Sequence, residues 1–263
     1  MRWLMPTIAC VLAVPLSSGC AIDEGTALAA DFEADWAGTA NVASIHTTKN
    51  NTLPFSGTAT GVLVLEEDTT DELVSERADA LREYVARHDK VTGRITAAGI
   101  TFTVVADKER TREVLALWRS LTADGRVMNG DIHDASRKGT DGRRSEVTAV
   151  DATGAMAVFK DMVSDGGRHR PLSDVSSSKV STGRGVRPGL SVGTGADGTL
   201  PTEAIAAYEA VVTQHPVVSA GLHHDRASIV VAEGVDPVRA RERARSAAPN
   251  LGAAVTVRSD SGA

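Results

Sequence analysis

The sequence repeats itself, and this repeat restricts the possible folds more than any other feature. Residues 88–127 align without gaps on residues 215–254, an offset of 127 positions. Few residues are identical between the two copies, so the evidence is the shared order of apolar patterns. A shared pattern of this length predicts that the chain builds one supersecondary unit twice.

The first copy is expected to form a hairpin followed by a helix. Residues 91–97 and 100–105 alternate apolar and polar side chains, and Ala98-Gly99 between them has the composition of a tight turn. Asp107 is placed to cap the helix that follows. The apolar residues of that helix recur at helical spacing: Val114, Leu115, Trp118 and Leu121.

The second copy shows the same features. Residues 217–222 and 227–232 are expected to be strands joined by a turn at His224-Asp225. Asp236-Pro237 then places a capping residue before a proline in the first helical turn, where proline is tolerated.

The match extends upstream with a small change of length. Thr69-Thr70-Asp71-Glu72 has the spacing of a capping box, and its counterpart helix begins near Pro201. The apolar faces of these two helices are Val74, Ala78, Leu81 and Val85 in the first and Ile205, Tyr208 and Val212 in the second. Further strands are expected at residues 39–47, 57–65 and 126–133 and at 174–182, 187–193 and 253–258. A short strand at 145–150 and a helix over residues 155–163 begin the second half, and residues 27–36 match that helix in the first.

The predicted class is therefore α+β. Each half has the order β-α-β-β-α-β, the split βαβ or ferredoxin-like arrangement, in which helices cover one face of an antiparallel sheet. The predicted organisation is two tandem domains from an internal duplication. Its parts are a signal peptide (1–19), a lipid-anchored tether (20–30), a first domain (31–135), a linker (136–144) and a second domain (145–263).

The N-terminus carries the features of an export signal. Arg2 precedes an apolar run over residues 3–16, which is too short to cross a bilayer, and small residues lead to Cys20. The segment Leu16-Ser17-Ser18-Gly19-Cys20 resembles the lipobox of bacterial lipoproteins. That resemblance implies a diacylated Cys20 at the start of the mature chain, on the outer face of the cytoplasmic membrane. The abundance of Arg, Ala, Gly and Val is typical of high-GC bacteria and points to a Gram-positive source. Cleavage after Ala27-Leu28-Ala29, which gives a secreted protein, is the alternative.

Composition then excludes several chemistries. The two cysteines are Cys10, inside the signal, and Cys20, so a lipidated mature chain has no thiol for disulfides, cysteine-ligated zinc or nucleophilic catalysis. From Cys20 onward, 27 Lys and Arg face 34 Asp and Glu, a formal charge of −7. Such a balance is not that of a nucleic-acid-binding protein. Aromatic content is 3%, and Trp36 and Trp118 are expected to be core residues.

Two further resemblances concern the cell envelope. The helix, hairpin, helix and strand of each copy are similar to BON-type domains of periplasmic proteins, with Gly99 at the family's hairpin glycine in the first copy and Asp225 or Arg226 there in the second. The similarity implies a binding or assembly role. The segment Leu73-Val74-Ser75-Glu76-Arg77-Ala78 is similar to the helix of peptidoglycan-anchoring domains. By that resemblance Arg77 would hold the diaminopimelate group of the wall peptide; otherwise it is a solvated helix charge.

Histidines offer weak candidates for a metal site. His223, His224 and Asp225 adjoin at a predicted turn and could meet zinc or copper, although neighbouring strand residues point to opposite faces. The alternative is a polar turn. Asp131 and His133 share a strand face, with Asp134 next, and are expected at the surface.

No catalytic motif for serine hydrolysis, zinc proteolysis or phosphate binding is present. The glycine-rich segment 193–198 is expected to be a strand-to-helix turn, and Arg168, Arg170, Arg184 and Arg187 would form an anion site only if they gathered beside it.

The sequence thus favours a lipid-anchored, extracytoplasmic binding or assembly module with no catalytic residue and no cofactor. Its partners would be the membrane, through Cys20, and an envelope protein or the cell wall, but not nucleic acid. A metal-assisted hydrolase using His223 and His224, or a secreted small-molecule binder, remains the alternative.

Overall fold

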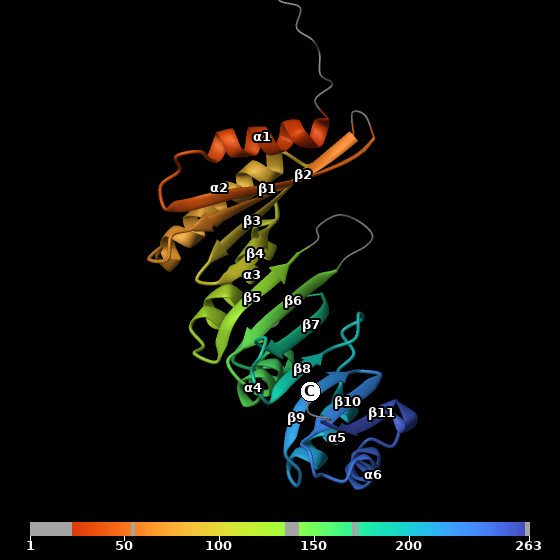
Figure 1. Ribbon diagram of the computed structural model, residues 1–263. Coiled ribbons are helices and arrows are strands. Elements are labelled where there is room, and N and C mark those ends of the chain that lie inside the picture. Colours follow the sequence, from red (N-terminus) through yellow and green to blue (C-terminus); the bar gives the residue numbers. More distant parts are fainter. Residues whose placement is uncertain (1–22, 54–55, 135–141, 170–171, 173, 261–263) are drawn as a thin grey trace, which may run out of the picture.

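The computed structural model describes residues 23–53, 56–134, 142–169, 172 and 174–260. Within these residues the chain forms an α+β fold of six helices and one sheet of eleven strands (Figure 1). The helices are α1 (Glu24–Trp36), α2 (Asp71–Arg87), α3 (Lys108–Thr122), α4 (Ala152–Val163), α5 (Thr202–Val212) and α6 (Pro237–Ala247). The strands are β1 (Val42–Leu53), β2 (Ser56–Leu65), β3 (Val91–Ala97), β4 (Ile100–Val104), β5 (Val127–His133), β6 (Arg143–Ala149), β7 (Val175–Thr182), β8 (Gly189–Gly193), β9 (Val217–His223), β10 (Arg226–Val231) and β11 (Val255–Ser259).

The strands lie in the sheet in the order in which they occur along the chain. Strands joined directly, such as β3 and β4, pair antiparallel, whereas strands separated by a helix, such as β2 and β3, pair parallel. The first five helices are each followed by a hairpin, and α6 is followed by the last strand. The sheet is therefore mixed throughout.

This arrangement corrects the prediction of two antiparallel, ferredoxin-like sheets. The α+β class and the order of elements are confirmed, but each strand that follows a helix pairs with the strand immediately before that helix. In addition, β5 at the end of the first half pairs with β6 at the start of the second. The two halves consequently share one sheet, because the last strand of the first half pairs with the first strand of the second half and neither edge is left unpaired.

The halves themselves repeat closely. Helices α1, α2 and α3 with β1 to β5 recur as α4, α5 and α6 with β7 to β11, in the same order and with the same pairing sense. Residues 24–30 of the expected tether belong to α1, and Arg143 and Arg144 of the expected linker belong to β6. The rest of the linker up to residue 141, and the whole signal segment with Cys20, lie outside the described residues.

One face of the sheet is buried along its whole width. Directly paired residues Leu63, Ile95, Phe102 and Ile132 are fully buried. Ile132 pairs with the buried Ser145, and two residues further along β6 a second buried row begins, formed by Val147, Val180, Val192 and Leu222. The helices cover this face, as their buried apolar stripes show.

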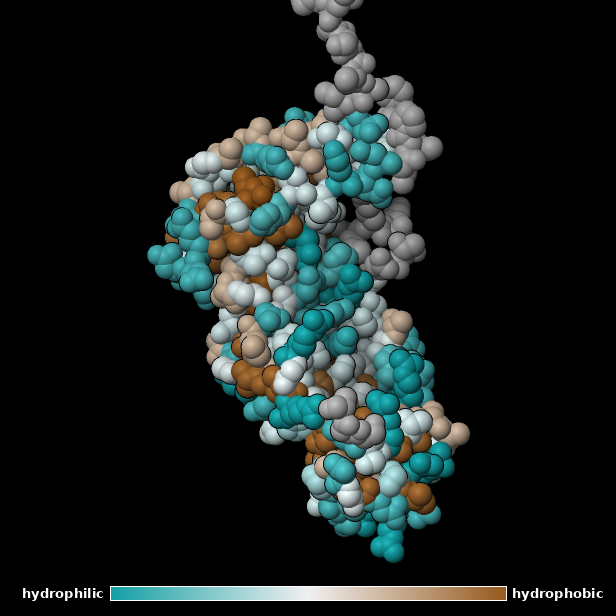
Figure 2. All heavy atoms as spheres, viewed as in Figure 1, coloured by the Kyte–Doolittle hydropathy of each residue, from teal (hydrophilic) through white to brown (hydrophobic). Residues whose placement is uncertain are grey.

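The opposite face carries mostly hydroxyl and charged side chains, among them the paired Thr60 and Thr92 and the paired Thr148 and Ser181. Figure 2 shows largely teal and white side chains over the central strands. An antiparallel or mixed sheet with one covered and one solvated face is expected to alternate in this way.

Local sequence explains where the helices begin. Side chains of Thr70, Asp107, Asp151 and Asp236 each accept a hydrogen bond from a backbone N–H of the first helical turn. The predicted caps at Asp107 and Asp236 are confirmed. The capping-box spacing of Thr69 with Glu72 placed the start of α2 one residue too early, because the cap is Thr70. Trp36 and Trp118 are buried, as expected.

Candidate functional site

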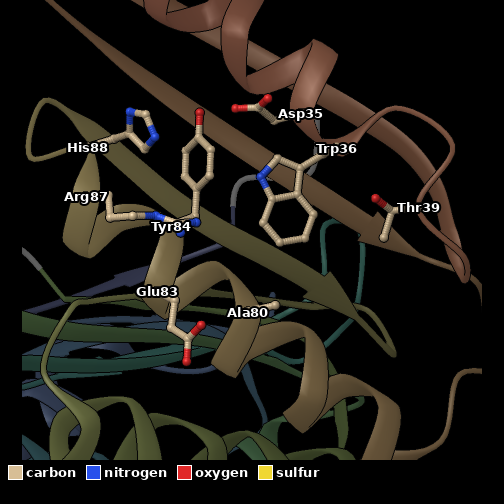
Figure 3. Close-up of a pocket in the computed structure, with 8 residues that line it drawn as sticks. All are labelled: Asp35, Trp36, Thr39, Ala80, Glu83, Tyr84, Arg87 and His88. Carbon is tan, nitrogen blue, oxygen red and sulfur yellow. The ribbon is translucent and has the colours of Figure 1, made fainter.

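A cavity of about 420 Å³ lies between the C-terminal parts of α1 and α2 (Figure 3). It is lined by Asp35, Trp36 and Thr39 from α1 and the turn after it, and by Ala80, Glu83, Tyr84, Arg87 and His88 from α2 and its cap. Both helices reach this place because they pack side by side on β2 and β3. Phe32 of α1 lies over Gly61, where a Cβ would be 2.3 Å from its ring, and Leu81 and Val85 of α2 lie over the paired Gly93.

Aromatic rings form the floor of this pocket. Trp36 is 7% exposed and Tyr84 is 5% exposed. The Tyr84 ring meets Phe32 edge-on at 5.4 Å between centroids and Trp36 at 6.0 Å, and it stacks on His88 at 4.3 Å. Edge-to-face and offset-stacked rings are the favoured geometries of aromatic pairs, and such pairs contribute about 0.5–1.5 kcal/mol beyond their buried area. Contacts between rings therefore hold the base of the pocket together.

Two polar atoms of that base have no hydrogen-bond partner within 3.5 Å among the described residues. They are the buried Trp36 Nε1 and the buried Tyr84 Oη. Figure 3 shows the indole nitrogen on the Tyr84 side and the Tyr84 hydroxyl directed toward the Asp35 carboxylate. A buried polar atom without a partner costs about 1–3 kcal/mol, and most such atoms in folded proteins are paired. Two in one pocket are a reason to look for a ligand.

The charge of the pocket is predominantly negative. Asp35 and Glu83 lie on the exposed rim, and Arg87 is the one permanently charged cation of the lining. Both helices also end here, and α1 has no basic residue in its last turn to balance the partial negative charge of its terminal carbonyls. Burial raises the pKa of Tyr84 to about 12, and the charge of Asp35 and a long side-chain contact with its carboxylate add to this effect, so the hydroxyl stays protonated.

The sequence predicted that Trp36 is buried, but it did not predict the pocket. The available signal was a pair of aromatic residues four positions apart near the end of each helix, Phe32 with Trp36 and Tyr84 with His88.

The predicted His223, His224 and Asp225 do come together. His223 ends β9, and His224-Asp225 form the turn into β10, as predicted. One possible ligand atom from each of the three residues lies within 4.8 Å of the others. None of the described cavities is lined by them.

A second cluster, which the sequence did not predict, is buried between α3, β5 and the segment after α4. His169 is fully buried, with Nε2 2.9 Å from Asp124 Oδ2 and Nδ1 2.8 Å from Ser120 Oγ. Arg126 forms ion pairs with Asp124 at 2.6 Å and with Asp161 at 2.7 Å. Its guanidinium group supplies the positive charge that a metal ion would otherwise bring. Arg126 holds the pKa of Asp124 far below its usual range, and burial lowers the pKa of His169.

The serine, histidine and aspartate of this cluster resemble a hydrolytic triad only in residue type. The aspartate is neutralised by arginine, and none of the described cavities adjoins the serine. The cluster instead ties three segments together, and a structural role accounts for every contact in it.

The other candidates from the sequence have separate partners. Arg77 is 16% exposed in its side chain and donates to the Ala40 carbonyl at 3.3 Å, so it is neither a solvated charge nor directed into the pocket. Arg168 lies 3.9 Å from Asp124 and Arg187 lies 3.5 Å from Asp260, so these two do not gather into an anion site, and Arg170 is outside the described residues. Residues 193–198 form the connection from β8 to α5, as expected.

Asp131 and Asp134 differ although they are close in sequence. Asp131 binds Arg94 at 2.6 Å on the polar face of the sheet. Asp134 is buried rather than at the surface, and binds Arg143 at 3.0 Å and also Arg110. Arg143 is 2% exposed and also binds Glu113, so this network fastens α3 and β5 to β6 where the two halves meet.

None of the described helices has the length and hydropathy of a membrane-crossing segment. Comparison with known proteins finds no match for this chain among protein-family models, curated proteins or solved structures.

Proposed function

We propose that this protein is a lipid-anchored binding module of the cell envelope that holds an amine-bearing polar ligand in the pocket between α1 and α2. The observation that carries the proposal is the pair of buried, unpartnered polar atoms at the floor of a negatively charged cavity. The lipid anchor rests on the signal-like N-terminus and Cys20.

The chemistry of the lining indicates the ligand class. Carboxylates at Asp35 and Glu83, together with the C-terminus of α1, favour a cation, whereas Arg87 already balances the C-terminus of α2. Tyr84 Oη can accept a hydrogen bond from an ammonium group, whereas Trp36 Nε1 can only donate. A ligand with an ammonium group beside an oxygen acceptor, such as an amino sugar, would satisfy both atoms.

The location supports an envelope ligand. Helix α1 begins at Glu24, four positions after Cys20, so a lipid on Cys20 would hold the α1–α2 half of the sheet next to the bilayer. A diacyl anchor is sufficient for stable attachment without other membrane contacts. Ligands in the adjoining wall would then be within reach of the pocket.

The test compares glucosamine with N-acetylglucosamine, which differs by loss of the ammonium charge. Calorimetric titration of the protein near neutral pH should show binding of glucosamine, accompanied by a change in Trp fluorescence, and binding of the acetylated sugar at least about tenfold weaker. Asp35→Asn should weaken glucosamine binding by a similar factor, whereas Asp68→Asn, an exposed aspartate away from the pocket, should not. Equal binding of both sugars, or none, would contradict the ligand class.

The anchor is tested separately. Cys20→Ala should move the protein from the membrane fraction to the soluble fraction, and mass spectrometry of the parent should show a diacylated N-terminal cysteine. A soluble parent with an unmodified Cys20 would favour a secreted small-molecule binder.

The metal-assisted hydrolase is less well supported. Its residues lie on the β9–β10 turn and do not line the α1–α2 pocket.

A further inference from the structure

The β9–β10 turn lies in the other half of the sheet from the α1–α2 pocket (Figure 1). It presents two imidazoles and a carboxylate, and the proposed ligand pocket makes no use of them. We propose that this turn, with the neighbouring Asp197, binds a divalent transition metal, either zinc or copper.

The turn allows His223 and His224 to approach the same ion. Adjacent residues on a strand point to opposite faces, so His223 and His224 could not share an ion in a regular strand. The strand ends at His223, however, because His223 pairs with Arg226 across a two-residue turn. Beyond that point the backbone bends, and the two imidazole centroids lie only 4.3 Å apart.

Three possible ligand atoms then lie close together. His223 Nδ1 lies 2.7 Å from Asp225 Oδ1, and one ligand atom from each of His223, His224 and Asp225 lies within 4.8 Å of the others. Metal bonds to imidazole nitrogen and carboxylate oxygen are about 2 Å long, so an ion fits after the His223–Asp225 hydrogen bond opens. Nitrogen with oxygen donors suits zinc and copper, and copper is generally bound more tightly.

His224 provides independent evidence. Its Nδ1 is buried and has no hydrogen-bond partner among the described residues. A histidine nitrogen in that condition is usually satisfied by water or a ligand. Here a lone pair on Nδ1 is available for a metal.

The loop between β8 and α5 brings a further carboxylate. A Cβ built on the buried Gly195 would lie 2.7 Å from Asp197 Oδ1 and 2.9 Å from His224 Nδ1, so both atoms adjoin the same position. Asp197 is thus placed to act as the fourth ligand.

Arg226 is the competing cation. Its Nη1 lies 3.5 Å from Asp225 Oδ1, on the carboxylate that the metal would use. Removing this charge should therefore strengthen metal binding.

The experiment uses untagged protein purified from membranes, with any free thiols alkylated so that cysteine cannot bind the metal. Calorimetric titration with ZnCl₂ should show one site per chain. His224→Ala and His223→Ala should each weaken binding at least about tenfold. Loss of a group that only hydrogen-bonds to a metal ligand already weakens metal affinity by about that factor. His215→Ala, a histidine of the same half outside the turn, should leave the affinity unchanged, and Arg226→Gln should raise it.

A second measurement does not depend on variants. One equivalent of CuSO₄ should give an electron paramagnetic resonance spectrum with hyperfine structure from two imidazole nitrogens. Circular dichroism and thermal melting establish that each variant is folded. The proposal is overturned if the parent binds neither metal, if its copper spectrum lacks two nitrogens, or if a folded His224→Ala variant keeps the parent affinity.

Discussion

The two halves of the molecule have the same scaffold, but only the first has the aromatic pocket. The offset of 127 residues takes Phe32 to Phe159, and both are fully buried. The same offset takes Trp36 to Val163, which has no polar atom in its side chain to satisfy. In the second half, Lys160 Nζ of α4 binds Glu209 Oε1 of α5 at 2.9 Å.

In the first half, neither Asp35 nor Arg87 forms an ion pair with another described residue. At this place the phenylalanine shared by both halves packs in the core, whereas Trp36, which the first half alone has, lines a cavity. The site is therefore an addition to the scaffold, and shared and unshared residues should respond differently to substitution.

The largest effects are expected at the shared phenylalanines. Phe32→Ala and Phe159→Ala should each lower the free energy of unfolding by about 3–5 kcal/mol, because each removes a fully buried ring from one continuous core. Urea denaturation followed by circular dichroism measures both. A large loss at Phe32 with almost none at Phe159 would show that the halves do not use the shared position alike.

The contact between the halves comes next. Arg143→Met should cost about 3 kcal/mol, because it leaves the buried Asp134 with Arg110 as its main counter-charge. Arg144→Met, at the neighbouring exposed position on the same strand, is the matched control. If the Arg143 variant instead unfolds in two separate steps, the halves are more independent than a single sheet implies.

Acid should destabilise the protein through the buried His169, which lies outside the pocket. Burial lowers the pKa of His169 in the folded state, so the unfolded chain takes up the proton first as pH falls below about 6.5. Stability should then decrease, by at most about 1.4 kcal/mol per pH unit for one proton. The depressed pKa of Asp124 adds a loss below about pH 4.

Thermal melts between pH 5 and 7 should therefore show a smaller pH dependence in His169→Gln than in the parent. His46→Gln, on β1, should keep the parent's pH dependence. An unchanged slope in His169→Gln would mean that other groups cause the acid sensitivity.

The sequence predicted the elements better than their pairing. Residues 91–97 were predicted as a strand and form β3, because alternation with period two is visible locally. The side-by-side pairing of β2 and β3, and of β5 and β6, depends on contacts between residues far apart in sequence. Alternating strands are compatible with either partner, so local patterns do not distinguish a split βαβ sheet from this one.

The candidate sites show the same division. His223, His224 and Asp225 adjoin in sequence, so their proximity was predictable, whereas the bend that brings the rings together was not. Trp36 and Tyr84 meet only because α1 and α2 pack on neighbouring strands. The buried state of Asp134 likewise depends on Arg143, which approaches from the next strand.

The smallest effect on stability, and the sharpest test of the difference between the halves, is expected at Tyr84. Tyr84→Phe removes an unpartnered buried hydroxyl but keeps the ring and its contacts with Phe32, Trp36 and His88. The free energy of unfolding should change by less than about 0.5 kcal/mol, or increase, because no hydrogen bond shorter than 3.5 Å is lost. Glucosamine binding should nevertheless weaken. Tyr208→Phe on α5, in the half without the pocket, should leave binding unchanged. A large loss of stability in Tyr84→Phe would mean that the hydroxyl already has a partner in the folded protein, and the pocket would then lose half of the evidence for its ligand.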